Sequence, residues 1–314
     1  MSDDTDADLA RSAVGAMLAA SGAHEGRVVH VKGGWAQGTF TGTPHGAALC
    51  RAPFLDGRSV RALVRFSNAG GDPVAHDGDR GGRGIAVKLY LDDDARCDLL
   101  GISVPCFTAR TPEDFVEYVR LARRDPDTGQ PDPAKIAAFL AAHPETAAAL
   151  ALAGAVPPPA SWLAVTYNGI HAFRWSAADG RARWVRTRWV PTRGNEFLTD
   201  EDAQRRDRDH LAADLRARLA DGPSSFGLEA RLAATDDPID DATAVWPDDR
   251  EAVTVGGLVI EHAIEAPETA SDIRVFDPMR LCDGIEASAD PILRFRPKVY
   301  DLSARGRWSG RNDV

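Results

Sequence analysis

A tyrosine near the carboxyl end of the chain is surrounded by arginines. The segment RFRPKVYDLSARGRW, residues 294–308, contains a single tyrosine, Tyr300, and Arg296 precedes it by four residues. Residues four apart share one face of a helix, so the Arg296 guanidinium can lie against the phenol oxygen. A fixed positive charge at hydrogen-bond distance favours a phenolate, which is a hard anionic ligand suited to ferric iron. Because arginine is abundant in this chain, the pair by itself also fits a helix face without function.

A histidine among valines is the second candidate. His30 lies in the strand-like stretch RVVHVKG, between Val29 and Val31. A lone histidine in such a stretch is most simply a structural residue, but an imidazole that faces a pocket can act as a general acid and base. The sequence contains no Walker A loop, HExxH or GxSxG motif.

These residues must be positioned by a fold that contains both strands and helices. Alternating, glycine-interrupted segments predict strands over residues 27–43, 59–67, 83–91, 97–107, 162–175, 182–191, 226–234 and 252–262. Helical spacing predicts helices over residues 8–20, 111–124, 132–155 with a break at His143-Pro144, 200–220 and 290–308. An acidic surface loop is expected over 235–252 and an irregular segment over 263–289. Several closely spaced strands with attached helices indicate an antiparallel barrel, and a barrel of about eight strands can hold a ligand.

Composition narrows the class of protein. The chain has 314 residues and a net charge of −10, which disfavours nucleic acid and anionic membranes as partners. Its four cysteines form no CxxC pair, so a reducing compartment fits best. The N-terminus, MSDDTDADLA, is acidic where a signal peptide is basic. We therefore expect a cytoplasmic protein, with an acidic tail and helix over residues 1–24 and one domain over residues 25–314.

Eight segments together resemble the haem catalases, and most closely the short catalase-related peroxidases that lack an extra C-terminal domain. They occur in the family's order over residues 25–308 and read RVVHVKGGWAQGTF, VRFSNAGGDP, RGIAVKLYL, DLLGISVPCFTARTPEDF, YNGIHAFRW, VGGLVIEH, FDPMRLCDGIEASADPIL and RFRPKVYDLSARGR. The resemblance implies an α+β fold, with an antiparallel eight-stranded barrel surrounded by helices. It also implies haem, of the b type, between the barrel and the helix that carries Tyr300.

The resemblance assigns a role to residues on each side of the haem. Tyr300 is expected to be the iron ligand and Arg296 to keep it ionised, with His171 and Asp290 supporting the arginine. On the opposite side, His30 is expected to be the acid and base that helps to break the O–O bond, and the Ser67 hydroxyl to orient it. The remaining matches contact haem: Arg27, Arg65 and Arg307 at the propionates, Phe115 on one haem face and Val29 on the distal wall.

One catalytic position departs from the family. Catalases have a distal asparagine in GNNTP, whereas this chain reads GISVP and has Ile102 there. Ser103 could take over the amide's role only if the strand were offset by one residue, which would turn its side chain to the other face. A distal phenylalanine is also replaced by Thr108, and a valine of the entrance channel by Ala69. These changes predict a pocket that is less suited to disproportionating peroxide.

Three functional hypotheses follow from the resemblance. The first is a haem-dependent peroxidase that uses hydrogen peroxide to oxidise a small organic substrate, with weak catalase activity. The second is oxygenation, dehydration or rearrangement of one small molecule in a biosynthetic pathway, as allene oxide synthases perform on this fold; the apolar Ile102 would suit an apolar substrate. The third is a haem carrier or sensor, against which the retained His30 and Ser67 argue. We expect no nucleic-acid or membrane partner, and a homodimer or homotetramer as is common in the family.

Overall fold

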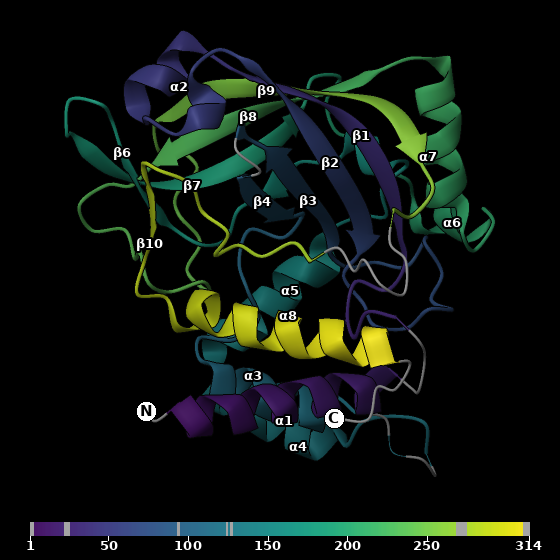
Figure 1. Cartoon of the computed structure of the whole chain (residues 1–314). Helices are drawn as coiled ribbons and strands as arrows, with labels where there is room; N and C mark the ends of the chain where they lie inside the picture. Colours follow the sequence, from purple (N-terminus) through teal and green to yellow (C-terminus); the bar gives the residue numbers. More distant parts are fainter. Residues whose placement is uncertain are drawn as a thin grey trace.

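A closed antiparallel barrel forms the centre of the fold in the computed structural model (Figure 1), which describes residues 3–21, 26–92, 95–123, 125, 128–267 and 275–309. Its eight strands are β1 (Gly33–Gly42), β2 (Ser59–Asn68), β3 (Arg83–Tyr90), β4 (Arg96–Ile102), β5 (Tyr167–Asn168), β7 (Ala182–Pro191), β8 (Ser224–Leu232) and β9 (Ala252–Ile264). The order is β7-β5-β4-β3-β2-β1-β9-β8, and pairing of β7 with β8 closes the circle. The prediction of an eight-stranded antiparallel barrel is therefore confirmed.

Large apolar side chains fill the barrel. Phe40, Phe66, Trp189 and Phe226 are each 0% exposed, and Phe40 meets Trp189 edge to face with ring centroids 6.0 Å apart. Alternation of inward apolar and outward polar residues gives the strands this shared core. Two short strands, β6 (Phe173–Ser176) and β10 (Ile285–Ala287), extend the sheet beyond β7.

Helices surround the barrel, and one group lies beneath it. The helices are α1 (Asp3–Ser21), α2 (Pro44–Leu49), α3 (Pro112–Leu121), α4 (Pro133–Ala142), α5 (Pro144–Ala155), α6 (Asp200–Gln204), α7 (His210–Asp221) and α8 (Pro291–Ser309), with 3₁₀ turns at Pro53–Leu55 and Trp162–Ala164. In Figure 1, α8 crosses below the barrel and α1 lies under α8. Apolar residues of α1, α3 and α8 form a second core that includes Val14, Val116 and Val299. Among the described helices, none alone is long and apolar enough to cross a membrane; the pair α4 and α5, bent by 114°, passes by length and composition only.

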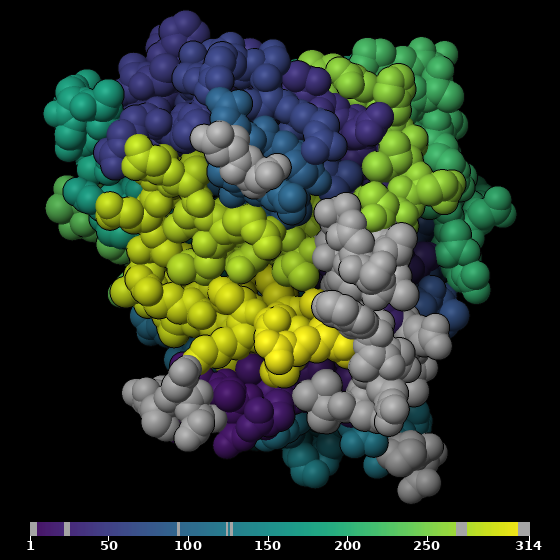
Figure 2. All heavy atoms as spheres, in the orientation of Figure 1, coloured from purple at the N-terminus to yellow at the C-terminus, as the bar shows by residue number. Residues whose placement is uncertain are grey.

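The chain approaches α8 through residues 275–290, which we call the wrapping segment. An ionic cluster around a buried pair holds it to the barrel. Lys88 Nζ lies 2.7 and 2.8 Å from the two carboxylate oxygens of Asp98, and the partly exposed Arg280 donates from Nη1 to Asp98 Oδ2 at 2.5 Å. Lys88 and Arg280 also both donate to the Val275 carbonyl. Figure 2 shows this part of the chain in yellow and yellow-green, between the blue barrel strands and the purple helix α1.

Several predicted elements differ from the structure in extent. The strand expected from residue 27 begins at Gly33, so His30 lies in a bend before it. The strand expected over 97–107 ends at Ile102, three residues before Pro105, which has no N–H for a ladder. Residues 162–175 contain a 3₁₀ turn and two short strands, and residues 200–220 contain two helices. The helix breaks where the run QRRDRD offers no apolar side chain to the core.

Candidate active site

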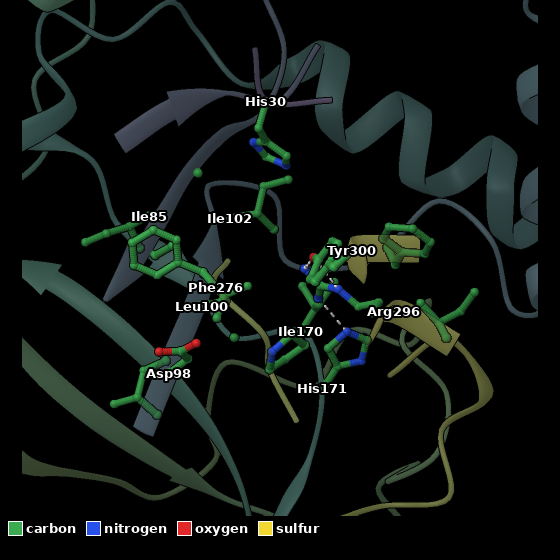
Figure 3. A pocket seen from close by; sticks show the side chains of 18 of the residues that line it. His30, Ile85, Asp98, Leu100, Ile102, Ile170, His171, Phe276, Arg296 and Tyr300 are labelled. Atoms are coloured by element: carbon green, nitrogen blue, oxygen red, sulfur yellow. Dashed lines mark hydrogen bonds between the residues drawn. The ribbon is translucent and has the colours of Figure 1, made fainter. Parts of the chain in front are cut away.

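Tyr300 and His30 line one cavity from different parts of the molecule. The cavity has a volume of about 230 Å³ and lies between the barrel, the wrapping segment and α8. Figure 3 shows His30 at one end of the view, Tyr300, Arg296 and His171 gathered at the other, and Ile102 between them. Residues separated by most of the length of the chain thus share one chemical environment.

A chain of hydrogen bonds leads from Asp290 to Tyr300, as predicted. Asp290 Oδ2 lies 2.7 Å from His171 Nδ1, and His171 Nε2 lies 2.8 Å from Arg296 Nη1. Arg296 then donates to the Tyr300 oxygen from Nε at 2.8 Å and from Nη2 at 2.5 Å. Because a guanidinium has no acceptor, the phenol oxygen accepts both bonds and His171 Nε2 must also accept. His171 therefore carries its proton on Nδ1 and donates it to Asp290.

Asp290 performs two tasks with its two oxygens. Its Oδ1 accepts the backbone N–H groups of Ile292 at 2.9 Å and Leu293 at 3.2 Å, which caps the first turn of α8. Its Oδ2 fixes the tautomer of His171, and both residues are buried. Burial lowers the pKa of His171 to about 4, although the hydrogen bond with Asp290 opposes this shift. A neutral imidazole with one acceptor nitrogen is the form that Arg296 requires.

His30 pairs with Ser67 on the opposite side of the cavity. Its Nδ1 lies 2.9 Å from Ser67 Oγ, so its Nε2 remains for a ligand. Gly84, opposite Ser67 in β3, leaves the room for this pair: a Cβ at Gly84 would lie 3.0 Å from both the His30 ring and the Ser67 hydroxyl. Burial, followed by the positive charges of Arg65, Arg296 and Arg27, lowers the pKa of His30 to about 3. The imidazole is therefore a neutral base near neutral pH.

The backbone of His30 adopts a left-handed conformation, with φ of 56°, and it is the one described residue other than glycine with positive φ. Arg65 Nη2 donates to the His30 carbonyl at 2.7 Å, which helps to hold this bend. Histidine tolerates the left-handed region better than most residues, but such strain is concentrated at functional sites. The sequence pattern predicted a strand here because alternation does not reveal a single left-handed residue.

The structure places Ile102, and not Ser103, in the cavity wall. Ile102 is paired with Gly84 and lines the cavity. Ser103 lies outside the lining, and its Oγ accepts the backbone N–H of Arg83 at 2.9 Å. The strand is therefore not offset by one residue, and Ser103 does not take the place of the amide.

Asn168 is a polar wall residue that the sequence reasoning missed. It lies on β5 directly opposite Ile102, lines the cavity, and its Nδ2 lies 3.4 Å from the Ile102 carbonyl. Only the pairing of β4 with β5 brings this carboxamide beside Ile102, and a two-residue strand gives too little alternation to predict that pairing.

The other predicted contact residues divide into three groups. Val29, Phe115, Arg27 and Arg65 all line the cavity. Neither Ala69 nor Thr108 is among the lining residues, although Ala69 and Ile102 both lie next to Gly82. Arg307 belongs to helix α8, but its side chain lies outside the described part of the structure.

The residues present fit a haem group. The lining is mainly apolar, as a porphyrin face requires, and Phe115 and Phe276 supply aromatic contacts. Arg27 and Arg65 border the same space, and each guanidinium lies over the Trp35 ring, at 5.7 and 5.6 Å from its centroid. Two arginines held together suit a pair of carboxylates. The cavity thus offers what a haem with a tyrosine ligand needs: a phenol oxygen for the iron, apolar walls for the porphyrin and arginines for the propionates.

A second group of potential metal ligands lies outside the cavity. This group consists of Asp114, His143 and Glu145. Each offers one ligand atom, these atoms lie within 4.8 Å of one another, and all three residues are partly buried. Asp114 and Glu145 occupy the first turns of α3 and α5, where acidic side chains stabilise the helix dipole. Helix stability therefore accounts for the two acidic residues without a metal.

Comparison with known proteins shows what this chain is similar to. The family model described as catalase matches residues 24–313. A catalase-related peroxidase of Mycolicibacterium paratuberculosis is 42% identical over 297 residues, which are 94% of this chain and 93% of that protein. A catalase-related peroxidase of Synechococcus elongatus is 36% identical over 281 residues, covering 90% and 83%.

Solved structures show the same fold in longer proteins. The structure of a fungal catalase superposes with a TM-score of 0.79 at 27% identity, and covers 90% of this chain and 60% of its own. Catalase A from Saccharomyces cerevisiae gives a TM-score of 0.76 at 26% identity, with 89% and 60% covered. The chain therefore spans about 60% of these longer catalases.

Proposed function

The chain belongs to the catalase family, and from this premise we propose that it is a haem-dependent peroxidase that uses hydrogen peroxide to oxidise a small organic reductant, with weak catalase activity. One observation supports the choice: the His30–Ser67 pair and the Arg296–Tyr300 pair line the same cavity, while Ile102 replaces the expected amide. The residues that would hold haem and move protons are present, and the amide expected at position 102 is absent.

Each side of the cavity contributes a separate step. When bound, haem supplies an iron that exchanges electrons with peroxide and then with the reductant. Tyr300 would hold this iron and Arg296 would fix the phenol oxygen, with Arg27 and Arg65 at the propionates. The His30 Nε2 accepts a proton from one oxygen of hydrogen peroxide and returns it to the other, which leaves as water. Ser67 keeps the imidazole oriented throughout.

Ile102 decides between the two fates of peroxide in this proposal. In catalase turnover a second peroxide must be held and oxidised to oxygen, and a carboxamide donor favours this by positioning it. A hydrocarbon side chain makes no hydrogen bond, and losing one such contact in a transition state costs about 10²–10³ in rate. An organic reductant faces no such loss, because it needs only to reach the haem edge.

The test measures both reactions in one sample. Purified protein reconstituted with haem is mixed with hydrogen peroxide, with and without a phenolic reductant, while peroxide, oxidised phenol and oxygen are followed together. We expect peroxide loss to accelerate with the phenol and to exceed the loss explained by oxygen evolution. Oxygen that accounts for all peroxide consumed, with or without phenol, would contradict the proposal. An unchanged Soret band and no peroxide loss would favour a haem carrier or sensor.

A second candidate is rearrangement or dehydration of an organic hydroperoxide. The apolar wall at Ile102 favours it, because an apolar chain can pack there without leaving a polar group unsatisfied. A fatty-acid hydroperoxide supplied without reductant distinguishes the two. Conversion to an isomer or dehydrated product supports this candidate, whereas reduction to an alcohol only when phenol is added supports the peroxidase.

A further inference from the structure

Three cysteines that are distant in the sequence meet where the wrapping segment crosses the barrel. Cys97 is the second residue of β4, Cys282 lies in the wrapping segment, and Cys50 follows α2. The Cys97 sulfur lies near enough to Cys282 that both the thiol and the backbone of Cys282 affect its pKa. Cys50 and Cys97 are members of the barrel core, and Cys282 packs against it. Two thiols held in one cluster are the geometric starting point of a disulfide.

The backbone on both sides of this contact is fixed. The N–H of Asp98, next to Cys97, donates to the carbonyl of Arg280 at 3.0 Å. The N–H of Asp277 donates to Asp98 Oδ2 at 2.8 Å, within the ionic cluster that holds the wrapping segment. The two sulfurs are therefore kept close by bonds that do not depend on the sulfurs themselves.

The two cysteines differ in access to solvent. Cys97 is 0% exposed, whereas Cys282 is partly exposed. The hydrogen bond with Cys282, together with burial, raises the pKa of the Cys97 thiol well above its usual value. A dissolved oxidant therefore meets Cys282 first, and Cys97 keeps its proton until a neighbouring sulfur becomes electrophilic. Cys50 is less suited to pair with Cys282, since its thiol already donates to the Gly284 carbonyl at 3.4 Å.

We propose that Cys282 and Cys97 are a peroxide-oxidised thiol pair that forms a disulfide between the wrapping segment and β4. The Cys282 thiolate attacks one oxygen of hydrogen peroxide, the O–O bond breaks, and hydroxide leaves, so Cys282 becomes a sulfenic acid. The Cys97 sulfur then attacks the Cys282 sulfur, the S–O bond breaks, and the proton lost by Cys97 leaves with the hydroxyl as water. One peroxide is reduced to two water molecules, and two thiols are oxidised.

The proposal rests on the proposed function only for the presence of peroxide around this protein. The wrapping segment supplies Val275, Phe276 and Leu281 to the cavity lining, so a disulfide at Cys282 fixes part of the wall. A cross-link between residues far apart in the chain restricts the unfolded state most. The oxidised protein should therefore withstand heat better and release haem more slowly than the reduced protein, at the time when peroxide is abundant.

The test counts thiols in full-length protein reconstituted with haem. Reduced protein is treated with hydrogen peroxide or, in parallel, with diamide, which oxidises thiol pairs without using haem. Denatured samples are then titrated for free thiols and digested without reductant for mass spectrometry. We expect a fall from four thiols to two, a Cys97–Cys282 peptide, reversal by dithiothreitol, and a rise in melting temperature of roughly 4–8 °C.

Matched variants separate this pair from general oxidation. Cys97→Ser and Cys282→Ser should each abolish the linked peptide and the melting shift. Cys106→Ser should abolish neither, because Cys106 is buried in a different cluster with Val104 and Ala149. Four free thiols after both oxidants, or a link that involves Cys50, would overturn the assignment. A link with diamide but none with peroxide would overturn the role of peroxide, whether or not the peroxidase activity is found.

Discussion

The α8 side and the barrel side of the cavity preserve different amounts of the expected chemistry. On the α8 side, Asp290, His171, Arg296 and Tyr300 are all present and joined by hydrogen bonds of 2.5–2.8 Å. On the barrel side, the proton-transfer pair is kept, but Ile102 stands where an amide is expected. In the proposed site, holding the metal depends on a hydrogen-bonded chain in which each member fixes the protonation of the next. Positioning a substrate depends on single side chains, and reaction preference can therefore change there without loss of the cofactor.

The largest effect should follow removal of the phenol oxygen on the α8 side. Tyr300→Phe keeps the ring and deletes the group that accepts both bonds from Arg296. Haem binding should weaken by more than the roughly 10–100-fold that outer partners of a metal ligand cost, and peroxide consumption should fall to background. Haem titration and the ferric spectrum measure this. Tyr118→Phe, outside the cavity lining, is the control, and an unaltered spectrum for Tyr300→Phe would refute the ligand assignment.

On the barrel side, loss of the base should slow the chemistry and spare the cofactor. His30→Ala should reduce the rate of the spectral change with peroxide by about 10²–10⁴-fold, while haem content stays close to that of the unaltered protein. Ser67→Ala should have a smaller effect, because it removes orientation and leaves the base. Stopped-flow absorbance gives both rates. Equal rates for His30→Ala and the unaltered protein would remove the proton-transfer role.

Asp290→Asn tests whether the hydrogen bonds from Asp290 to Tyr300 act together. Asp290→Asn can still cap α8 through its oxygen, but its amide meets His171 Nδ1 as a donor. His171 must then place its proton on Nε2, which faces the Arg296 donor. Haem affinity should fall by about 10–100-fold. Asp132→Asn, a cap substitution on α4, is the matched control; equal haem affinities in both variants would show that only capping matters.

Restoring an amide on the barrel side should recover part of the catalase activity. Ile102→Asn should raise oxygen evolution from peroxide by about tenfold, since one donor in such a position is worth 10²–10³ when ideally placed. Ile102→Val, which changes volume and adds no donor, should not raise it. An oxygen electrode measures both variants. No gain with asparagine would mean that another feature of the wall limits catalase activity.

A different kind of effect is expected on stability in acid, where both sides contribute. The pKa values of His30 and His171 are lowered to about 3 and about 4, so below pH 6.5 the unfolded chain binds protons that the folded chain does not. Stability is therefore lost as pH falls from 6.5 toward 4, by up to about 2 kcal/mol for each histidine by pH 5. Urea unfolding of haem-free protein tests this. His30→Asn tolerates positive φ and should remove roughly half of the loss; an unchanged pH dependence would contradict it.

The sequence predicted the barrel and the α8 side well because their patterns are local or regular. Long alternating strands such as β3 and β7 were placed within one residue, and Arg296 and Tyr300 meet because a helix brings residues four apart together. The break between α4 and α5 at His143 was also predicted, since a proline follows it. The haem type, the compartment and the number of subunits stay predictions.

The missed features depend on contacts between distant parts of the chain. The left-handed backbone of His30 is held by Arg65, and Asn168 reaches Ile102 only through a pairing of two-residue length. The cysteines looked scattered because spacing in sequence does not show that the wrapping segment crosses β4. Such contacts are set by tertiary packing, which local patterns do not encode.

His30 and Tyr300 line one cavity although 270 positions separate them in the sequence. On a ribosome that adds about 5–20 residues each second, His30 is made roughly 15–50 seconds before Tyr300, whereas the last barrel strand, β9, is complete only about 2–7 seconds before it. A nascent chain that lacks α8 therefore carries His30 without the phenol proposed to hold iron, and haem captured at that stage would lack this ligand. Cofactor insertion should consequently belong to the last stage of biosynthesis, after α8 has closed against the barrel.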